Sequence, residues 1–378
     1  MQNITIYYGP KSGFQKLLKF EEPVITLTNL AIISDKKMRE HLFKMESRKK
    51  NDPKENTSLN LERIKIKYLI AFSDEYAALS ESAIQGFLSF LSQFDIHSVF
   101  LQNPPMSITS QLYNSGYKIN VINYAYKQLS QDSLKRIYSQ FDQTIIGQQN
   151  VKRRLLNALY PVTNKNHKQP VVLLFYGPTG VGKTETAKLL SSLVKESLFR
   201  KQFSMFNSEE FASYLFGGKH FQSSLSRELL ERESNIILFD EFDKIHPVYY
   251  SAFYQIFDEG VYEDKNYSVT LENTVIICTS NFSSIDHIVQ CLGAPIYSRF
   301  DAIIEYDALS REAMENIASR EYSEQYEKLE HWEKKIIEHS NVRETIAQCI
   351  GSIENARHLK TLVKEKISEI LVENIMRG

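Results

Sequence analysis

The stretch VVLLFYGPTGVGKTETAKLL (residues 171–190) constrains the fold of this 378-residue chain more than any other segment. It joins an apolar run to a glycine-rich turn and then to a helical pattern. The turn fits the pattern G-x-x-x-x-G-K-[ST] through Gly177, Gly182, Lys183 and Thr184. Glycines let the backbone wrap so that its N–H groups point at phosphate oxygens, and the next helix adds its positive N-terminal end. The sequence therefore predicts a strand, a phosphate-binding loop and a helix of an α/β nucleotide-binding fold.

Two side chains of this loop have expected roles toward the phosphates. We expect the Lys183 ammonium to neutralise the β and γ phosphates and the Thr184 hydroxyl to bind Mg²⁺. The expected nucleotide-binding residues are Gly177, Pro178, Thr179, Gly180, Val181, Gly182, Lys183, Thr184 and Glu185. A match to this pattern alone can arise by chance, but here a strand precedes it and a helix follows it, as a phosphate loop requires.

Two carboxylates follow a second apolar run in NIILFDEFDKIHP (residues 235–247). A buried parallel strand has a continuous apolar pattern, and this one would deliver Asp240 and Glu241 to its carboxyl end beside the phosphates. We expect Asp240 to hold Mg²⁺ through water and Glu241 to polarise the water that attacks the γ-phosphate. A capping pair at the end of a strand is the structural alternative.

A third apolar run, NTVIICTSN (residues 273–281), ends in a polar side chain. At the tip of a strand, the Asn281 amide would orient the lytic water or contact the γ-phosphate. An asparagine in a turn that ends the strand would give the same pattern, so both interpretations stay open.

These segments together resemble one family. GPTGVGKTE, FDEFDKIHP, FDEG and LENTVIICTSN, in this order and spacing, are similar to the AAA+ ATPases of the Clp unfoldase and disaggregase group, in particular to their second ATPase module. The resemblance covers roughly residues 136–376 and does not extend to the first 135. It implies a parallel sheet flanked by helices, a C-terminal helical lid, and ATP with Mg²⁺ as ligands.

The resemblance also implies roles that spacing alone does not. IIGQQNVKRRLLNAL resembles the segment that leads into the family's ATPase module, so Ile145 and Ile146 would flank adenine, and Asn281 would be the first sensor. YSRFD resembles the arginine-finger segment, which makes Arg299 the residue that reaches the γ-phosphate of a neighbouring subunit. NARHLK resembles the second sensor, which makes Arg357 the lid's contact with ATP, although Asn355 stands where the family usually has Gly. From the residues alone, a surface salt bridge explains Arg299 and a helix-capping charge explains Arg357.

An arginine finger supplied by a neighbouring subunit places the active site at an interface, so the resemblance implies a homo-oligomeric ring. A hexamer is the first expectation for its size. Clp unfoldases pull a chain through the ring with a loop that carries an aromatic residue. At that position this sequence has LFGGKHFQSS (residues 215–224), which makes Lys219, His220 and Phe221 a candidate pore loop. Phe221 would contact substrate and Gly217 and Gly218 would let the loop swing. However, the segment is shorter than in the unfoldases and lacks their Gly-aromatic-small-Gly pattern, which the related torsins also lack.

Two hypotheses about function follow. In the first, the chain is an ATP-driven remodeller of protein substrates, and its N-terminal domain recruits them. In the second, it is an ATP-controlled assembly switch that presents the N-terminal domain to a protein partner or a nucleic acid without threading polypeptide.

The chain divides into three regions by pattern. We expect an N-terminal α/β domain (1–135), a large ATPase subdomain (136–306) and a helical lid (307–378). In the first region, five apolar runs predict strands and Ile84, Phe87, Leu88, Leu91 and Phe94 predict one helix with an apolar face. The predicted strands cover residues 4–8, 24–28, 68–72, 98–102 and 119–126.

One part of the N-terminal region is basic: residues 35–67 hold eleven Lys or Arg against six Asp or Glu. An acidic partner or a nucleic acid could bind there, but Phe43 is the only aromatic residue among them, so no series of stacking platforms interleaves, and residues 46–60 are predicted to be an exposed loop. The whole chain has a formal net charge of −1, which gives no general attraction for nucleic acid or membrane. Three widely spaced cysteines, no signal-peptide pattern and no long apolar run predict a cytoplasmic protein that does not enter the membrane.

Overall fold

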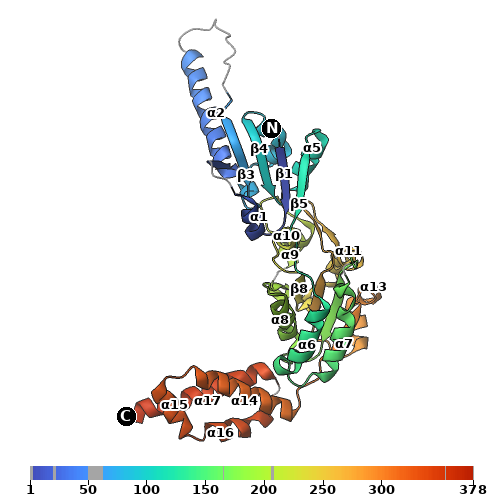
Figure 1. The fold of residues 1–378 in the computed structure, drawn as a ribbon, viewed down its shortest axis with the longest axis vertical. Helices are drawn as coiled ribbons and strands as arrows, with labels where there is room; N and C mark the ends of the chain where they lie inside the picture. The colour runs from blue at the N-terminus through green and yellow to red at the C-terminus, as the bar shows by residue number, and fades with distance from the viewer. Residues whose placement is uncertain are drawn as a thin grey trace. The chain divides into compact units, whose positions relative to one another are not determined.

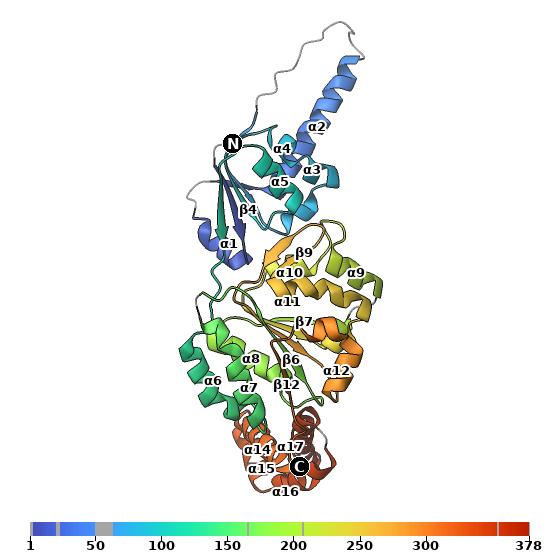
Figure 2. The ribbon, with the colours of Figure 1, turned by 90° about the vertical axis from the view of Figure 1, so that its right-hand side faces the viewer.

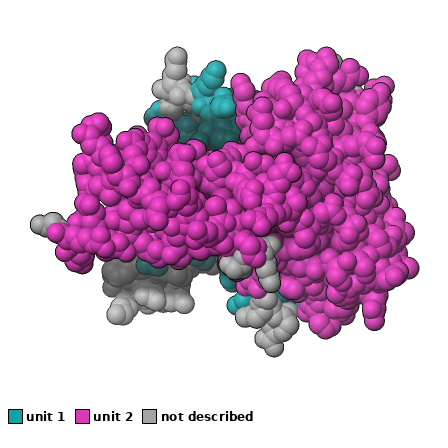
Figure 3. Space-filling view, turned by 90° about the horizontal axis from the view of Figure 1, so that it is seen from below, with its two compact units in different colours: residues 1–126, 206–233, 261–270 teal, residues 127–205, 234–260, 271–378 magenta. Residues whose placement is uncertain are grey.

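The chain builds two five-stranded parallel sheets, one from its first 126 residues and one around the phosphate loop. The computed structural model describes residues 3–19, 23–49, 63–164, 166–205, 208–353 and 355–377. The strand orders are β2-β3-β4-β1-β5 and β12-β6-β11-β8-β7. The contacts divide the chain into two units, coloured in Figure 3, and the first unit takes in two segments from the middle of the sequence.

Unit 1 contains the N-terminal sheet and the helices around it, as the alternation of strands and helices predicts (Figure 1). Its strands are β1 (Asn3–Tyr8), β2 (Val24–Thr26), β3 (Lys65–Ala71), β4 (Asp95–Gln102) and β5 (Ile119–Asn123). Its helices in this region are α1 (Lys11–Leu17), α2 (Leu27–Lys49), α3 (Glu81–Gln85), α4 (Phe87–Leu91) and α5 (Met106–Asn114). Buried side chains from strands and helices form an apolar core between them, and a smaller cluster forms around Phe14 of α1.

Three local predictions in this region need correction. The strand expected over 24–28 ends at Thr26, whose hydroxyl accepts a hydrogen bond from the Asn29 amide and so favours the start of helix α2. The single helix expected around Ile84 to Phe94 is two short helices that meet at Gly86. Helix α2 extends to Lys49, so the start of the loop expected over 46–60 is helical, and residues 50–60 lie outside the described residues.

Two later segments complete unit 1. Residues 206–233 contribute helices α9 (Ser208–Phe216) and α10 (Leu225–Leu230), and residues 261–270 contribute the hairpin of β9 (Val261–Glu263) and β10 (Ser268–Thr270). Both contact the N-terminal sheet region: Arg227 donates to the Ser73 carbonyl at 3.1 Å, and the Met106 amide donates to the Asn266 carbonyl at 2.8 Å. The contacts thus give two units, each built from separate segments, whereas the sequence predicts three consecutive regions, whose boundaries remain predictions.

Unit 2 contains the second sheet and the helices on its two sides. Figure 2 shows α6, α7 and α8 along one side of the sheet and α12 along the other. The strands are β6 (Val171–Tyr176), β7 (Phe199–Gln202), β8 (Ile236–Asp240), β11 (Val275–Thr279) and β12 (Ala302–Glu305). The helices are α6 (Gln131–Thr144), α7 (Gln149–Leu159), α8 (Lys183–Val194), α11 (Tyr254–Glu259), α12 (Ile285–Leu292) and α13 (Ala294–Tyr297). Strands β6, β8 and β11 are buried at every position, as their continuous apolar runs predict.

The C-terminal part of unit 2 is a group of four helices with its own apolar core, which includes Leu359, Val363 and Ile367 of the last helix. The helices are α14 (Arg311–Glu327), α15 (His331–Glu338), α16 (Val342–Cys349) and α17 (Ala356–Arg377). This confirms that the C-terminal part is helical, as expected, and its role as a lid stays a prediction. None of the helices in the described ranges combines the length and apolar character that a bilayer-spanning helix requires.

Candidate nucleotide-binding site

The phosphate loop connects β6 to α8 through three glycines with positive φ. Gly177, Gly180 and Gly182 have φ of 128°, 73° and 110°, a region that other residues rarely adopt. A Cβ at Gly177 would lie 2.2 Å from the Tyr306 carbonyl oxygen, so a side chain does not fit there. The loop therefore has the conformation that its glycine pattern predicts, and α8 begins directly after it at Lys183.

Lys183 is buried inside the loop that it belongs to. Its ammonium donates to the Gly177 carbonyl at 2.6 Å, the Pro178 carbonyl at 2.7 Å and the Asn281 side-chain oxygen at 3.1 Å. Burial lowers the pKa of Lys183 to about 8, although the nearby carboxylates of Asp243 and Asp240 act in the opposite direction. Two residues that lie 98 positions apart, Lys183 and Asn281, are thus in direct contact at the carboxyl ends of the strands.

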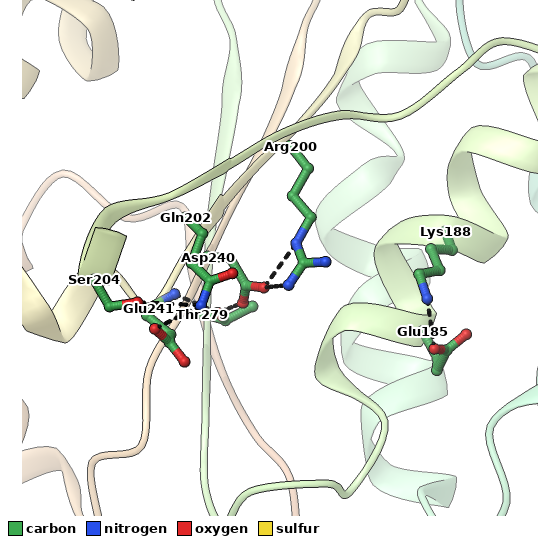
Figure 4. A network of polar contacts seen from close by, with 8 residues as sticks. All are labelled: Glu185, Lys188, Arg200, Gln202, Ser204, Asp240, Glu241 and Thr279. Carbon is green, nitrogen blue, oxygen red and sulfur yellow. Dashed lines mark hydrogen bonds and ion pairs between the residues drawn. The ribbon is translucent and has the colours of Figure 1, made fainter. Parts of the chain in front are cut away.

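Asp240 and Glu241 stand at the end of β8, as expected, and each has partners that the sequence did not reveal (Figure 4). Asp240 is buried, and its two oxygens accept from Arg200 and from the Thr279 hydroxyl. Glu241 is in the left-handed region with φ of 57°; its amide donates to the Thr279 hydroxyl at 3.0 Å. Its carboxylate accepts from the Gln202 amide at 3.1 Å.

Sequence reasoning missed Arg200, Gln202 and Thr279 as site residues. The signal for the first two is weak: they are alternate residues of strand β7, so they share one face, and β7 pairs with β8 in a register that sets Gln202 opposite Asp240. Thr279 is the last residue of β11, the strand that precedes Asn281. Its position as a polar residue at the carboxyl end of a strand next to β8 could have indicated that Thr279 belongs to the site.

A cavity of about 500 Å³ opens over the phosphate loop, a volume typical of a small-molecule site. Of the residues predicted for the nucleotide, it is lined by Ile145, Ile146, Thr179, Gly180, Val181, Gly182, Lys183, Thr184, Glu185, Asp240, Glu241, Asn281 and Arg357. Gly177 and Pro178 are not among its lining residues and instead contribute carbonyls to Lys183. Arg320, Glu321 and Lys360 of the helical part also line it, although the sequence did not single them out.

Known proteins are similar to this chain over the residues that hold the phosphate loop. Residues 168–339 match the family described as AAA domain (Cdc48 subfamily). The chain is 25% identical over 273 residues to the chaperone protein ClpB of Malacoplasma penetrans, covering 66% of this chain and 39% of that protein. It is 26% identical over 283 residues to the ATP-dependent Clp protease ATP-binding subunit ClpE of Bacillus subtilis, covering 65% of this chain and 40% of that one. Residues 168–339 thus match an AAA domain, and about two thirds of the chain are similar to Clp-type ATPases.

Two further relatives define how far the likeness extends. The chloroplastic chaperone ClpB3 of Arabidopsis thaliana is 26% identical over 293 residues, covering 67% of this chain and 30% of that protein. A cryoEM reconstruction of Hsp104 in a closed state, with ATPyS and FITC casein, is similar in fold, with a TM-score of 0.54 and 20% identity; it covers 82% of this chain and 61% of that chain. The chain spans between 30% and 40% of the length of the three curated relatives.

The C-terminal helices reach the phosphate loop through the start of α17. The Ala356 amide donates to the Gly180 carbonyl at 3.3 Å, and Arg357 lines the cavity. Asn355 stands where the family usually has Gly, and its side-chain oxygen accepts from the His358 amide at 3.0 Å. Asn355 therefore caps the helix that carries Arg357, which gives the departure from the family pattern a structural role.

Arg299 of the AAA+ domain is placed differently from the other predicted site residues. Its guanidinium donates to Asp258 at 2.8 Å and to the Pro295 carbonyl at 2.5 Å, and it lies over the Tyr254 ring at 4.3 Å. Within the described residues it does not line the cavity of its own chain. Its expected contact with the γ-phosphate of a neighbouring subunit stays a prediction.

The candidate pore loop belongs to unit 1, where contacts hold it. His220 is buried, and its Nε2 donates to the Leu79 carbonyl at 3.0 Å. The Asn266 amide donates to the Gly218 carbonyl at 3.0 Å, and the Lys265 amide to the Phe216 carbonyl at 3.2 Å. Lys219 and Phe221 are exposed, with half of the Phe221 surface accessible.

Gly217 does not have the environment of a hinge. It has φ of 81°, and a Cβ there would lie 2.9 Å from the Lys265 amide nitrogen. The glycine is thus required by a close approach to the β9–β10 hairpin, and the hydrogen bonds around it fasten the loop. The free swing expected from Gly217 and Gly218 has no basis in these contacts.

The residues expected to hold Mg²⁺ fit that ion. Thr184 and Asp240 line the same cavity beside Lys183. No cluster of three or more His, Cys, Asp or Glu side chains within the described ranges is arranged to hold a metal ion. Mg²⁺ is usually bound by one or two carboxylates together with waters and substrate phosphates, so one carboxylate and one hydroxyl suffice when a nucleotide supplies the rest.

Proposed function

We propose that the chain is a Mg-ATP hydrolase that forms a ring and couples ATP turnover to the remodelling of a protein substrate. A hexamer is the ring size that we propose first. One observation carries the proposal: Lys183, Asp240, Glu241 and Asn281, from three separate strands and loops, line one cavity of nucleotide size. Arg357 lines the same cavity from the helical part, so that closure of the lid on ATP would depend on it.

Each residue has a role that follows from its position. Lys183 would exchange its carbonyl partners for phosphate oxygens, because a buried ammonium gains more from a charged partner. Asn281, already on Lys183, would contact the γ-phosphate and the attacking water. Glu241 would accept a proton from that water as the in-line attack proceeds. Mg²⁺, bound near Thr184 and Asp240, would neutralise charge on the β and γ phosphates.

Two variants test the hydrolytic assignment. Lys183→Ala should lose nucleotide binding, and Glu241→Gln should bind ATP and fail to turn it over. Equilibrium binding of a fluorescent ATP analogue and release of phosphate measure the two steps separately. Vigorous hydrolysis by Glu241→Gln would remove Glu241 as the base, whereas loss of binding in that variant would assign it a role in the ground state.

The position of Arg299 supports the proposed ring. Its guanidinium has partners on its own chain and, among the described residues, is not part of the lining of its own cavity, as expected of a residue that serves a neighbouring subunit. An arginine that reaches developing phosphate charge is worth on the order of 10³–10⁵ in rate. Arg299→Ala should therefore bind ATP and lose turnover.

A mixing experiment tests whether the finger acts between subunits. Arg299→Ala subunits contain an intact Glu241, and Glu241→Gln subunits contain an intact Arg299, so mixed rings would hold some complete sites. Partial recovery of ATPase activity on mixing would support a shared site. Mixed oligomers that form, as shown by co-purification, and remain inactive would count against it.

The anchored loop favours the assembly switch as a second candidate. Because His220, Gly218 and Phe216 are fastened to other parts of unit 1, the ATP cycle would act on the N-terminal domain through this segment, and Phe221 would not need to grip a substrate. In that case the N-terminal domain presents its surface to a partner, and hydrolysis resets the complex.

Phe221→Ala separates the two candidates, with Phe216→Ala as a control of matched exposure. ATP-dependent binding and release of FITC casein, which is present in the Hsp104 reconstruction, provide the assay. If the loop grips polypeptide, Phe221→Ala should lose casein handling and keep its ATPase activity, and the control should keep both. Unchanged casein handling by Phe221→Ala would reject threading and leave the switch.

A further inference from the structure

Strand β7 lies at the edge of the unit 2 sheet and places two polar side chains on the two acids of β8. Successive side chains of a strand point to opposite faces, so Arg200 and Gln202 share a face while Lys201 points away. Arg200 contacts Asp240, and Gln202 contacts Glu241. Figure 4 shows both pairs side by side. The edge strand thus holds both carboxylates of the site at once.

The contact between Arg200 and Asp240 is the stronger of the two. Both Nε and Nη2 of Arg200 donate to the same oxygen, Oδ2, at 3.0 and 2.5 Å. The other oxygen, Oδ1, accepts from the buried Thr279 hydroxyl. The Asp240 side chain is only 8% exposed, whereas that of Arg200 is 43% exposed. A buried carboxylate is therefore neutralised by one flexible guanidinium that reaches it from the cavity side.

The expected Mg²⁺ position requires the same carboxylate. Oδ1 is committed to Thr279, so water bound to the cation would have to approach Oδ2, where Arg200 now donates twice. A guanidinium and a hydrated divalent cation cannot both fill that place, since like charges repel at this range. We propose that Arg200 is a positioning residue that neutralises Asp240 in the nucleotide-free protein and gives it up when Mg²⁺ arrives with ATP. This inference rests on the proposed Mg-ATP site.

The exchange has a clear physical consequence. In the wild-type protein, Mg²⁺ must displace two charge-assisted hydrogen bonds, so part of its binding free energy is lost. The variant Arg200→Gln keeps a polar side chain on the strand and removes the competing charge. The contribution of Mg²⁺ to nucleotide affinity should then rise about tenfold, because a partly exposed ion pair of this geometry changes an equilibrium constant by about that factor.

The test measures binding and needs no turnover. The dissociation constant of mant-AMPPNP is determined for the full chain in EDTA and in Mg²⁺. The ratio of the constant in EDTA to the constant in Mg²⁺ is then compared between variants. We expect the ratio to increase about tenfold in Arg200→Gln and to increase less in Arg200→Lys, which keeps the charge without the planar fork. Lys135→Gln is the matched control, because Lys135 pairs with exposed Asp132 at 3.3 Å and neither residue is part of the cavity lining; its ratio should equal that of wild type.

A second readout separates this role from a purely structural one. Arg200→Gln should lower the thermal unfolding midpoint of the nucleotide-free protein, where Asp240 loses its partner, and leave that of the Mg-nucleotide form near wild type. Equal losses in both forms, or an unchanged or smaller Mg²⁺ ratio, would overturn the inference. A wild-type protein that binds no nucleotide in Mg²⁺ would instead reject the proposed function, and this inference with it.

Discussion

Thr279 tests whether the acid pair is organised by the neighbouring strand. It is buried at the end of β11, where its hydroxyl donates to Asp240 and accepts from the Glu241 amide at 3.0 Å. One hydroxyl therefore orients both acids, one through its side chain and the other through its backbone. Thr279→Val preserves the shape of the side chain and removes both hydrogen bonds.

The expected cost follows from the two groups left without a partner. A buried polar group that loses its hydrogen bond costs about 1–3 kcal/mol, and Glu241 lies where water can relieve part of its share. We expect Thr279→Val to destabilise strands β8 and β11 by about 2–4 kcal/mol. Thr279→Ser keeps the hydroxyl and loses one methyl group, so it should cost only about 1 kcal/mol.

Hydrogen–deuterium exchange of peptides that cover β8 and β11 measures the destabilisation locally. We expect Thr279→Val to exchange more than tenfold faster there than wild type, and to bind nucleotide while turnover falls, because Glu241 is no longer held. The Ser variant should remain close to wild type in both assays. If the Val and Ser variants exchange and turn over ATP alike, the hydroxyl does not organise the acids and this reasoning is wrong.

Two other predictions follow from the phosphate loop. Burial lowers the pKa of Lys183 from 10.5 to about 8. Between these two pH values the lysine is neutral in the nucleotide-free folded protein and protonated in the unfolded chain, so the free energy of unfolding should rise with pH. ATP binding at pH 8.5 should take up protons, because the phosphates favour the charged lysine. Calorimetry in two buffers of different ionisation enthalpy checks the uptake, and none at pH 8.5 would contradict the shift. Gly177→Ala should lose nucleotide binding more than tenfold, because its Cβ would lie 2.2 Å from a carbonyl oxygen. Gly351→Ala, which has open space, is the control and should bind as wild type does.

Local patterns predicted the elements that carry the chemistry. The apolar runs before Gly177, Asp240 and Asn281 became the central strands β6, β8 and β11, because a strand covered on both faces needs apolar residues throughout. The contact between Lys183 and Asn281 followed from both lying at the carboxyl ends of adjacent strands. Local patterns predicted the wrong element boundaries at two places. At Thr26 a helix cap ends the strand early, and at Gly86 a glycine separates α3 from α4.

The loop LFGGKHFQSS shows the limit of a family resemblance. Its position predicts a pore loop, but its contacts with Leu79 and with the β9–β10 hairpin involve residues far away in the sequence. A backbone carbonyl accepts each of these hydrogen bonds, and carbonyls leave no trace in residue type. The sequence could therefore indicate where the loop lies in the order of elements, and not what holds it.

The sequence by itself determined the phosphate loop, the acid pair and the helical C-terminal part, because glycine geometry, apolar periodicity and residue chemistry act over short distances along the chain. Only the tertiary structure decided that Arg200 and Thr279 hold Asp240, and that residues 206–233 and 261–270 join the N-terminal sheet. Those contacts depend on the register of parallel strands and on the path of the chain between them. An arginine on an edge strand and a threonine at a strand end have many possible partners, and only folding selects one.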